Sequence, residues 1–285
     1  MRLFLPFELW RQQHDSFMKN LEEFISLLDF YHMTIMPVLF NDCTVAKQFY
    51  KEPVPGPQLE PVEGFFGGTS DNSFDEETQT GITVGYSITD DEEMTPEIEK
   101  YVRELAKRYG QDDRVIIWNI WNELGNSGRG EKSLPMAKKV IGWLREEDVK
   151  QPLTIEMWGA QVKGNYYEWL NNPCFHGEVD RENIELSDII TFHFYGDYTH
   201  ARRMVKFLKQ FNRPLINTEW MHRPFQSLIQ THLPLWKRRK NRKLFFGLVN
   251  GKTQFHIAWD FIKEYPSVDT SVWMHDLYHA DFYSV

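Results

Sequence analysis

Residues 114–123 read RVIIWNIWNE, an apolar strand-like run that ends in the amide of Asn122 and the carboxylate of Glu123. A second run of this kind, PLINTEW at residues 214–220, carries Glu219 near its end. In parallel α/β folds, the residues at the carboxyl ends of strands build ligand and catalytic sites. The two runs therefore predict buried parallel strands that each present one carboxylate at the same edge of a sheet.

The rest of the chain repeats this design, because short apolar runs alternate with amphipathic helical segments, as in βαβ units. The seven runs that we expect to be strands cover residues 2–9, 33–40, 115–121, 153–158, 189–195, 215–220 and 244–249. A chain of 285 residues has the size of one (β/α)8 barrel, so we expect a single catalytic domain over residues 1–285. Seven runs are one short of a closed barrel. Either one strand is not recognised by this pattern or the first strand lies upstream of Met1. We favour the second explanation and expect a TIM-type α/β barrel that is incomplete at its N-terminus.

Two helices between these runs are well marked. The first should present an apolar stripe that consists of Phe17, Leu21, Phe24, Leu28 and Tyr31. The second should begin with Thr95 as N-cap and Pro96 at its first helical position, and should stop at Gly110. Its apolar face should consist of Ile98, Tyr101, Val102, Leu105 and Tyr109. Residues 44–93 are rich in Pro, Gly, Asp, Ser and Thr and predict a long loop on the C-terminal face of the barrel.

Composition and charge exclude several classes of partner. The hydrophobic fraction of 41% and the charged fraction of 26% are typical of a globular protein. A net charge of −9 would repel a nucleic-acid backbone or an anionic membrane, so we expect neither as a partner. The basic run at residues 237–240 should mark the end of a helix, where cations are favoured. Aromatic residues reach 15%, with 10 Trp, and serve equally well in a core or in stacking on sugar rings.

The two carboxylates suit one reaction in particular. Glycosidic bond hydrolysis needs one carboxyl group to protonate the leaving oxygen and a second to attack or to activate water. A single Glu at a strand end is more often structural, whereas two in this context favour catalysis. Period-two alternation would place Asn119, Trp121 and Glu123 on one face, Ile116, Trp118 and Ile120 on the opposite face, and Leu215, Asn217 and Glu219 together on the other strand.

The segment WNIWNELGNSGRG at residues 118–130 resembles the acid/base strand of glycoside hydrolase clan A, in particular of family 5-like cellulases, mannanases and xylanases. The segment LINTEW at residues 215–220 resembles their nucleophile strand. The likeness extends over nearly the whole chain, through RLFLPFELW for strand two, MPVLFNDC for strand three, TFHFYGD for strand six and FFGLVNGKTQ for strand eight. The resemblance implies a retaining glycoside hydrolase that acts on β-linked mannan, xylan or glucan.

Roles for single residues follow from the same resemblance. Glu123 would be the general acid/base and Glu219 the nucleophile, with their carboxyl groups about 5 to 5.5 Å apart, as retention requires. Asn122 would hold the sugar 2-hydroxyl, and Arg2 would orient the nucleophile and keep it ionised. The substrate-binding residues implied by the resemblance are completed by His193, Tyr195, Trp220 and Asn250.

The chain also departs from the family pattern. The usual strand-eight Trp is absent, and we expect Phe246, Asn250 or Trp259 to replace it. A His usually follows strand three, where this chain has Asn41 and Asp42. Glu156 is a third candidate carboxylate, although a buried and hydrogen-bonded structural role is the simpler interpretation.

Other signals are weak. The acidic residues 90–93 should form a solvated turn rather than a calcium loop. Phe65 and Phe66 would either stack on a sugar or pack the long loop. Cys43 and Cys174 form at most one disulfide. No phosphate loop or metal-ligand spacing is present in the sequence, and we expect neither cofactor nor metal.

Two alternatives remain open at this stage. The same residues would support transglycosylation, in which a sugar instead of water accepts the glycosyl group. The second alternative is an inactive barrel that only binds carbohydrate. The apolar run before Glu8 is too short for a secretory signal, but an upstream start would hide one, and the resemblance implies a secreted or periplasmic location.

Overall fold

The computed structural model describes residues 1–48, 50, 52, 84–162, 166–238, 242–244, 247–250, 256–257, 268–269 and 271–284. The chain divides into two compact units. The first comprises Met1–Gly56, Ile82–Gln161 and Gly177–Ile190, and the second comprises Pro57–Gly81, Val162–His176 and Thr191–Val285. The single domain expected over residues 1–285 stays a prediction.

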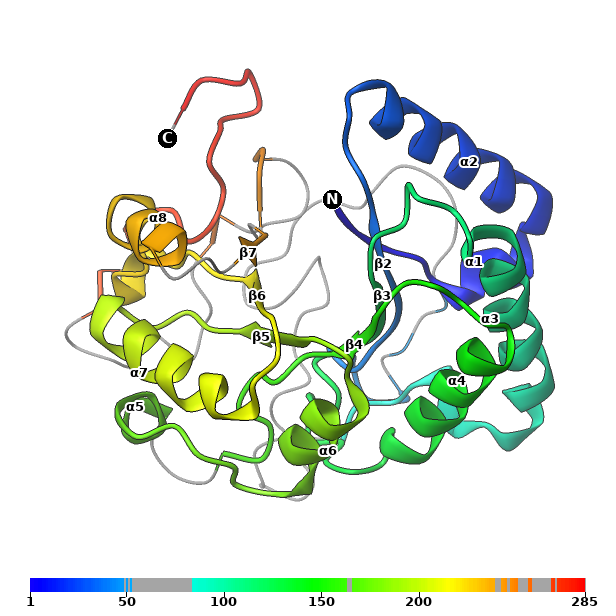
Figure 1. Cartoon of the computed structure of the whole chain (residues 1–285), viewed down its shortest axis with the longest axis horizontal. Coiled ribbons are helices and arrows are strands. Elements are labelled where there is room, and N and C mark those ends of the chain that lie inside the picture. Colours follow the sequence, from blue (N-terminus) through cyan, green and yellow to red (C-terminus); the bar gives the residue numbers. More distant parts are fainter. Residues whose placement is uncertain are drawn as a thin grey trace. The chain divides into compact units, whose positions relative to one another are not determined.

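The first unit is built on a four-stranded parallel sheet with the order β1-β2-β3-β4 (Figure 1). Its strands are β1 (Arg2–Phe4), β2 (Met36–Asn41), β3 (Trp118–Asn122) and β4 (Leu153–Ile155). The central strands β2 and β3 are almost wholly buried, which explains why their sequences are continuous apolar runs. Each strand lies within or at the end of a run that the sequence predicted.

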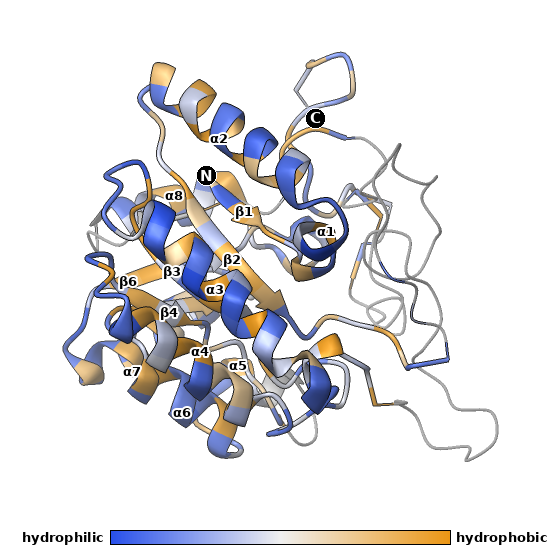
Figure 2. Cartoon of the chain, turned by 90° about the vertical axis from the view of Figure 1, so that its right-hand side faces the viewer, coloured by the Kyte–Doolittle hydropathy of each residue, from blue (hydrophilic) through white to orange (hydrophobic). Residues whose placement is uncertain are grey.

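Amphipathic helices follow these strands in the first unit. They are α1 (Phe7–Gln12), α2 (His14–Phe30), α3 (Thr95–Tyr109), α4 (Leu134–Glu146) and α6 (Glu178–Leu186). Their inner faces and the strands form one hydrophobic cluster, to which Ile25, Tyr101 and Val140 contribute from three different helices. Figure 2 shows the hydrophobic strands β2 and β3 behind the largely hydrophilic outer side of α3.

The two helices predicted in detail differ in how well they were predicted. In α3 the expected face is buried and the helix stops at Gly110, although the N-cap is Met94 and Thr95 is already helical. In α2 the stripe was partly wrong. Its buried positions are Met18, Leu21, Ile25 and Leu28, and the predicted Phe17 and Phe24 are partly buried and pack against the same core. Tyr31, which lies beyond the helix, is 64% exposed. A dense apolar sequence allows more than one stripe, and the packing partners select one of them.

Strand β3 contains an irregularity that changes which side chains share a face. Opposite β4, its register shifts between Asn119 and Trp121, so that one extra residue is inserted on β3. Trp121 belongs to the hydrophobic core and stacks on Phe40 with ring centroids 4.8 Å apart. The side chain of Asn119 instead accepts a hydrogen bond from Arg2. The prediction that Asn119 and Trp121 share one face was therefore wrong, because strict alternation assumes a regular strand.

The opposite face of β3 was predicted in part. Trp118 and Ile120 are buried in the hydrophobic core, as expected. Ile116 precedes the strand and is 39% exposed, so its expected packing against helices was wrong. The alternation was thus reliable only inside the regular part of the strand.

The second unit contains a three-stranded sheet with the order β5-β6-β7. Its elements are β5 (Ile190–His193), β6 (Leu215–Glu219), β7 (Arg242–Lys243), α5 (Tyr166–Asn171), α7 (Tyr198–Leu208) and α8 (Ile229–Arg238), with 3-10 turns at Lys209–Phe211 and Arg223–Phe225. The last strand was expected at residues 244–249 but forms earlier, because β6 pairs in parallel with residues 242–243. The basic run does mark a helix end, since α8 ends at Arg238.

The expected loop at residues 44–93 is described only at its two ends. Residues 53–83, and with them Phe65 and Phe66, lie outside the described residues. The acidic run forms short 3-10 turns at Ile88–Asp90 and Glu92–Met94. A fully solvated turn was wrong for Asp90, because its carboxylate pairs with the buried Arg129 at 2.7 Å.

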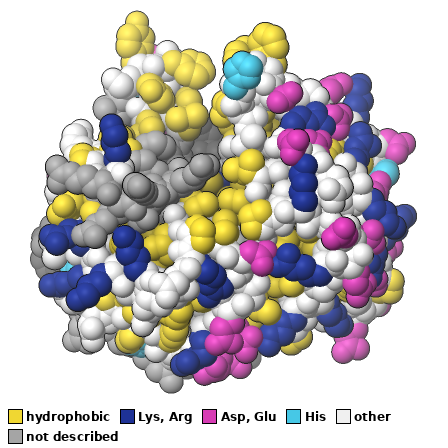
Figure 3. Space-filling view, in the orientation of Figure 1, with side chains coloured by type: hydrophobic (Ala, Val, Ile, Leu, Met, Phe, Trp, Pro, Cys, Tyr) yellow, Lys and Arg dark blue, Asp and Glu magenta, His cyan; other side chains and the backbone are white. Residues whose placement is uncertain are grey.

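Charges of both signs alternate over the helices of the first unit (Figure 3). Arg103 of α3, for example, binds Glu99 on its own helix and Glu146 and Glu147 at the end of α4. Among the described residues, no helix is both long enough and apolar enough to cross a membrane.

Candidate active site

The predicted acid/base, Glu123, immediately follows β3 in the first unit. Its φ of 44° places the backbone in the left-handed region, which non-glycine residues adopt at an energetic cost. The side chain is buried, and its Oε2 accepts hydrogen bonds from the Cys43 thiol at 3.0 Å and from Asn126 Nδ2 at 2.5 Å. The strained backbone and these two donors fix the position of the carboxyl group.

Burial raises the pKa of Glu123 above the ordinary value of a glutamate. The hydrogen bonds from Cys43 and Asn126, and the positive charge of Arg2, act in the opposite direction and limit this rise. A carboxyl group with a raised pKa keeps its proton at a pH where an ordinary glutamate has lost it. That is the requirement for a general acid.

Arg2 at the start of β1 organises the polar side chains beside this carboxyl group. Its guanidinium donates to Asn119 Oδ1 at 3.0 Å, to Asn122 Oδ1 at 2.5 Å and to Glu156 Oε1 at 2.9 Å. Glu156 is fully buried and paired with Arg2, as the structural interpretation expects, and its role stays a prediction. Asn122 also donates to Asn41 Oδ1 at 2.8 Å. Arg2 therefore links β1 to β3 and to the end of β4, which could not be inferred from the sequence.

A second buried network holds the loops that follow β2 and β3. Arg129 and Asp42 form an ion pair at 2.9 Å, and neither side chain has any exposed surface. Asp42 also accepts from the Gly125 backbone at 2.7 Å and from Ser133 Oγ at 2.9 Å. Asp42 lies in the segment after strand three where the family pattern usually has a His. In this structure it anchors the loop next to Glu123.

The predicted nucleophile, Glu219, is the last residue of β6 in the second unit, and it is buried. The Tyr195 hydroxyl donates to its Oε2 at 2.6 Å, and His193 Nε2 lies 3.5 Å from its Oε1. The backbone of Phe194 also donates to the Glu219 carbonyl at 3.1 Å. The structure places Tyr195 beside Glu219, where the family resemblance implies it, and it also places His193 beside Glu219, whereas the resemblance implies a position near the acid/base for this residue.

Two imidazoles that the sequence analysis did not select support this group. The His275 ring lies 5.3 Å from the Tyr195 ring and 5.6 Å from the His222 ring. His275 Nδ1 contacts the Met221 carbonyl at 2.6 Å. Burial lowers the pKa of His222 far below its ordinary value and that of His275 to about 3, so both rings are neutral. Isolated histidines give no sequence signal, and only the fold collects them.

The remaining predicted binding residues occupy different positions. Trp220 is fully buried and stacks on His232 with ring centroids 5.7 Å apart, which is a packing position. Asn250 is partly exposed and donates its backbone N–H to the Tyr278 carbonyl at 2.8 Å. The proposed substitutes Phe246 and Trp259 lie outside the described residues. Cys43 and Cys174 are both thiols, so neither forms a disulfide.

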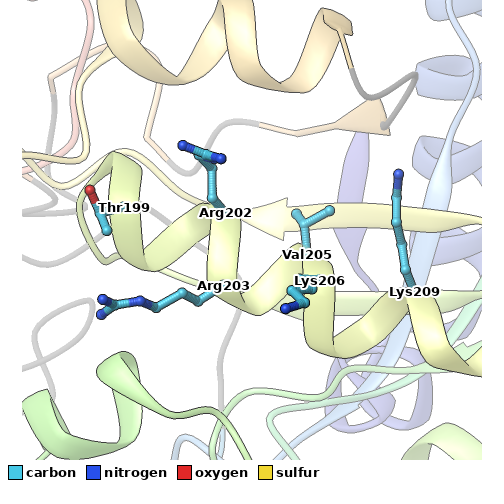
Figure 4. Close-up of a pocket in the computed structure, with 6 residues that line it drawn as sticks. All are labelled: Thr199, Arg202, Arg203, Val205, Lys206 and Lys209. Carbon is cyan, nitrogen blue, oxygen red and sulfur yellow. The ribbon is translucent and has the colours of Figure 1, made fainter.

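A groove of about 420 Å³ on α7 has the wrong chemistry for this reaction. Its lining side chains all come from the helix and the turn that follows it (Figure 4). They are Thr199, Arg202, Arg203, Val205, Lys206 and Lys209. Four cations without a carboxylate among the lining residues cannot supply acid and nucleophile, so this groove is separate from the candidate active site.

Comparisons with known proteins also indicate a glycoside hydrolase. Residues 74–264, more than half of the chain, match the family model described as cellulase, glycosyl hydrolase family 5. The chain is similar to the structure of XacCel5A in complex with cellopentaose, with a TM-score of 0.54 and 12% identity over 100% of this chain and 82% of that chain. The fold class is therefore the TIM-type α/β barrel, as predicted.

Two further solved structures match with lower TM-scores. One is the hyperthermostable endo-1,4-β-D-mannanase from Thermotoga petrophila RKU-1, with a TM-score of 0.49, 15% identity, and coverage of 88% of this chain and 72% of that chain. Another is the family 5 mannosidase from Rhizomucor miehei, with a TM-score of 0.48, 16% identity, and coverage of 94% and 73%. A comparison with curated proteins gives no match.

Proposed function

Because the chain belongs to the cellulase family, glycosyl hydrolase family 5, and is therefore a glycosidase, we propose that it hydrolyses β-linked glycans with retention by double displacement. Glu123 acts as the general acid/base and Glu219 as the nucleophile. The observation that carries this assignment is the environment of Glu123, a buried carboxyl group with a raised pKa at the end of a parallel strand.

The first step forms a glycosyl–enzyme ester. Glu219 attacks the anomeric carbon while Glu123 gives its proton to the leaving oxygen, so the glycosidic bond breaks as the ester bond forms. Tyr195 orients the attacking carboxylate, since its hydroxyl holds Oε2 at 2.6 Å. The other oxygen, Oε1, which lies 3.5 Å from His193 Nε2, makes the attack.

The second step releases the sugar. Glu123, now ionised, takes a proton from water, and that water attacks the anomeric carbon and displaces Glu219. Asn122 lies next to Glu123 in the chain, and the amide of Asn122 would bind the 2-hydroxyl of the sugar as charge develops. Arg2 fixes this amide through its bond to Asn122 Oδ1. We retain the proposal that Arg2 also orients Glu219.

Substrate class and location extend the proposal. We propose mannan, xylan or β-glucan as the substrate, and the description of the family as cellulase supports including β-glucan among them. Because Trp220 is buried, we propose that it supports the sugar site by packing, whereas Asn250 remains a proposed substrate contact. A secreted or periplasmic location is proposed on the family resemblance.

The test is an assay on aryl β-glycosides, β-glucan, mannan and xylan with purified wild type, Glu123→Gln and Glu219→Gln. We expect a loss of about 10²–10⁴-fold for Glu123→Gln and at least as much for Glu219→Gln. The exposed Glu185 of α6 offers a matched control, and Glu185→Gln should keep full activity. Equal turnover by all four proteins would refute the assignment.

Product analysis separates the alternatives. Proton NMR of the first-formed anomer should show retention, and inversion would exclude the ester intermediate. Transfer products that exceed hydrolysis at high acceptor concentration would show a transglycosylase. Binding of oligosaccharide without turnover by the wild type would show an inactive carbohydrate-binding barrel.

A further inference from the structure

Cys43 lies in the loop directly after β2, and its thiol contacts the carboxyl group of Glu123. The Sγ atom is 3.0 Å from Glu123 Oε2. Asn126 Nδ2 lies 2.5 Å from the same oxygen and 3.3 Å from Sγ, so thiol, amide and carboxyl group form one closed triangle. From the sequence, Cys43 was a candidate only for a disulfide.

The loop backbone and its neighbours hold the thiol in this place. The Cys43 N–H donates to Asn41 Oδ1 at 2.9 Å, and Asn41 Nδ2 donates back to the Cys43 carbonyl at 3.2 Å. Asn122 Nδ2 binds Asn41 Oδ1 at 2.8 Å and approaches Sγ at 3.4 Å. The next residue, Thr44, is tied to the loop after β3, because its N–H donates to Ser127 Oγ at 3.0 Å.

The direction of the hydrogen bonds determines what the thiol does. An amide NH₂ group only donates, so the sulfur acts as acceptor for Asn122 and Asn126. Its own proton is then available to Glu123 Oε2 when that carboxyl group is ionised. When Glu123 is protonated, its O–H can donate to the sulfur instead, because a thiol is both a weak donor and a weak acceptor. The same contact therefore serves both protonation states that an acid/base passes through in each cycle.

We propose that Cys43 is a positioning residue that holds Oε2 of Glu123 in its working orientation in both halves of the reaction. This inference rests on the proposed function, in which Glu123 is the acid/base. A residue that acts only through Glu123 must affect the steps that need a proton and leave the other steps unchanged.

Leaving-group dependence tests this role. The variants are Cys43→Ala, which removes the contact, and Cys43→Ser, which keeps a donor and acceptor. With a poor phenolic leaving group, kcat/KM of Cys43→Ala should fall about tenfold, the effect of roughly one hydrogen bond to a charged group. With a dinitrophenyl leaving group, which departs without protonation, kcat/KM should change by less than about twofold. Cys43→Ser should recover most of the loss.

The outcomes separate two kinds of failure. A wild type that cleaves neither substrate refutes the proposed function. The positioning role alone is refuted if the wild type cleaves both substrates and Cys43→Ala either lowers kcat/KM equally on both or lowers it on neither. Cys174→Ser is the matched control, because Cys174 is the only other cysteine and is exposed. Its leaving-group dependence should equal that of the wild type.

Thiol alkylation gives a second readout that needs no activity. Cys43 lines a cavity of about 230 Å³ together with Phe4, Asn41, Tyr50 and Tyr86, through which iodoacetamide can reach it. The thiolate is the reacting form, and a neighbouring carboxylate disfavours it. At about pH 8.5, Glu123→Gln should therefore alkylate faster than wild type at Cys43 and at the same rate at Cys174. An unchanged rate at Cys43 would show that thiol and carboxyl group do not interact.

Discussion

The Arg129→Met substitution tests the buried network that supports the loop carrying Glu123. Arg129 has no exposed side-chain surface, and its guanidinium donates to Asp42 at 2.9 Å, to Asp90 at 2.7 Å and to the Gly85 carbonyl at 2.7 Å. Met has a similar apolar stem but no charge or donor. The substitution therefore removes every bond of the guanidinium while keeping most of the packing.

The expected loss follows from what remains buried. Removing one partner of a buried ion pair usually costs about 3–5 kcal/mol, because the other charge is left without compensation. Here the carboxylate of Asp42 keeps its bonds to Ser133 Oγ and to the Gly125 backbone. We therefore expect the lower end, about 3 kcal/mol in the free energy of unfolding.

Urea unfolding followed by tryptophan fluorescence measures this loss. Lys132→Met is the matched control, because Lys132 also binds Asp90, at 3.0 Å, but its side chain is 51% exposed. An exposed pair contributes about 0–1 kcal/mol, so this variant should stay close to the wild type. Adding Asp42→Asn to Arg129→Met should restore part of the stability, since the stranded charge is gone. A loss below about 1 kcal/mol for Arg129→Met would refute the reasoning.

Three further substitutions test other parts of the first unit. Burial raises the pKa of Asp180 to about 7, whereas the unfolded chain releases this proton near about pH 3.9. The folded state thus holds the extra proton between these values, and stability falls by about 1.4 kcal/mol per pH unit as pH rises through that window. Asp180→Asn should remove this slope in urea titrations at several pH values, and a slope equal to that of the wild type would exclude the linkage. Gly125 has φ of 89°, and a Cβ there would lie 2.7 Å from the Gly130 carbonyl, so Gly125→Ala should lose about 1–3 kcal/mol. Gly142 of α4 has no atom within 4 Å of such a Cβ, so Gly142→Ala should raise the free energy of unfolding by about 0.5–1 kcal/mol. Thermal midpoints measure both glycine variants, and a higher midpoint for Gly125→Ala than for Gly142→Ala would contradict both expectations.

Much of the candidate site was predictable because catalytic side chains in this fold lie at strand ends. Strand ends can be recognised locally, as the point where an apolar run gives way to polar residues. This rule found Glu123 and Glu219 and, through the family resemblance, Tyr195 and His193. Period-two alternation, a different rule, failed for Trp121, because the register shift at Asn119 leaves no trace in the apolar pattern.

The succession of strands along the chain, their buried character and the two carboxylates at the ends of β3 and β6 follow from the sequence alone, because hydrophobic periodicity is a local property of the chain. The contacts of Arg2, Cys43 and Arg129 do not. Each joins residues that lie from 39 to 154 positions apart in the chain. Which partner such a side chain meets depends on the register between strands and on the course of the loops, and only the tertiary structure determines both.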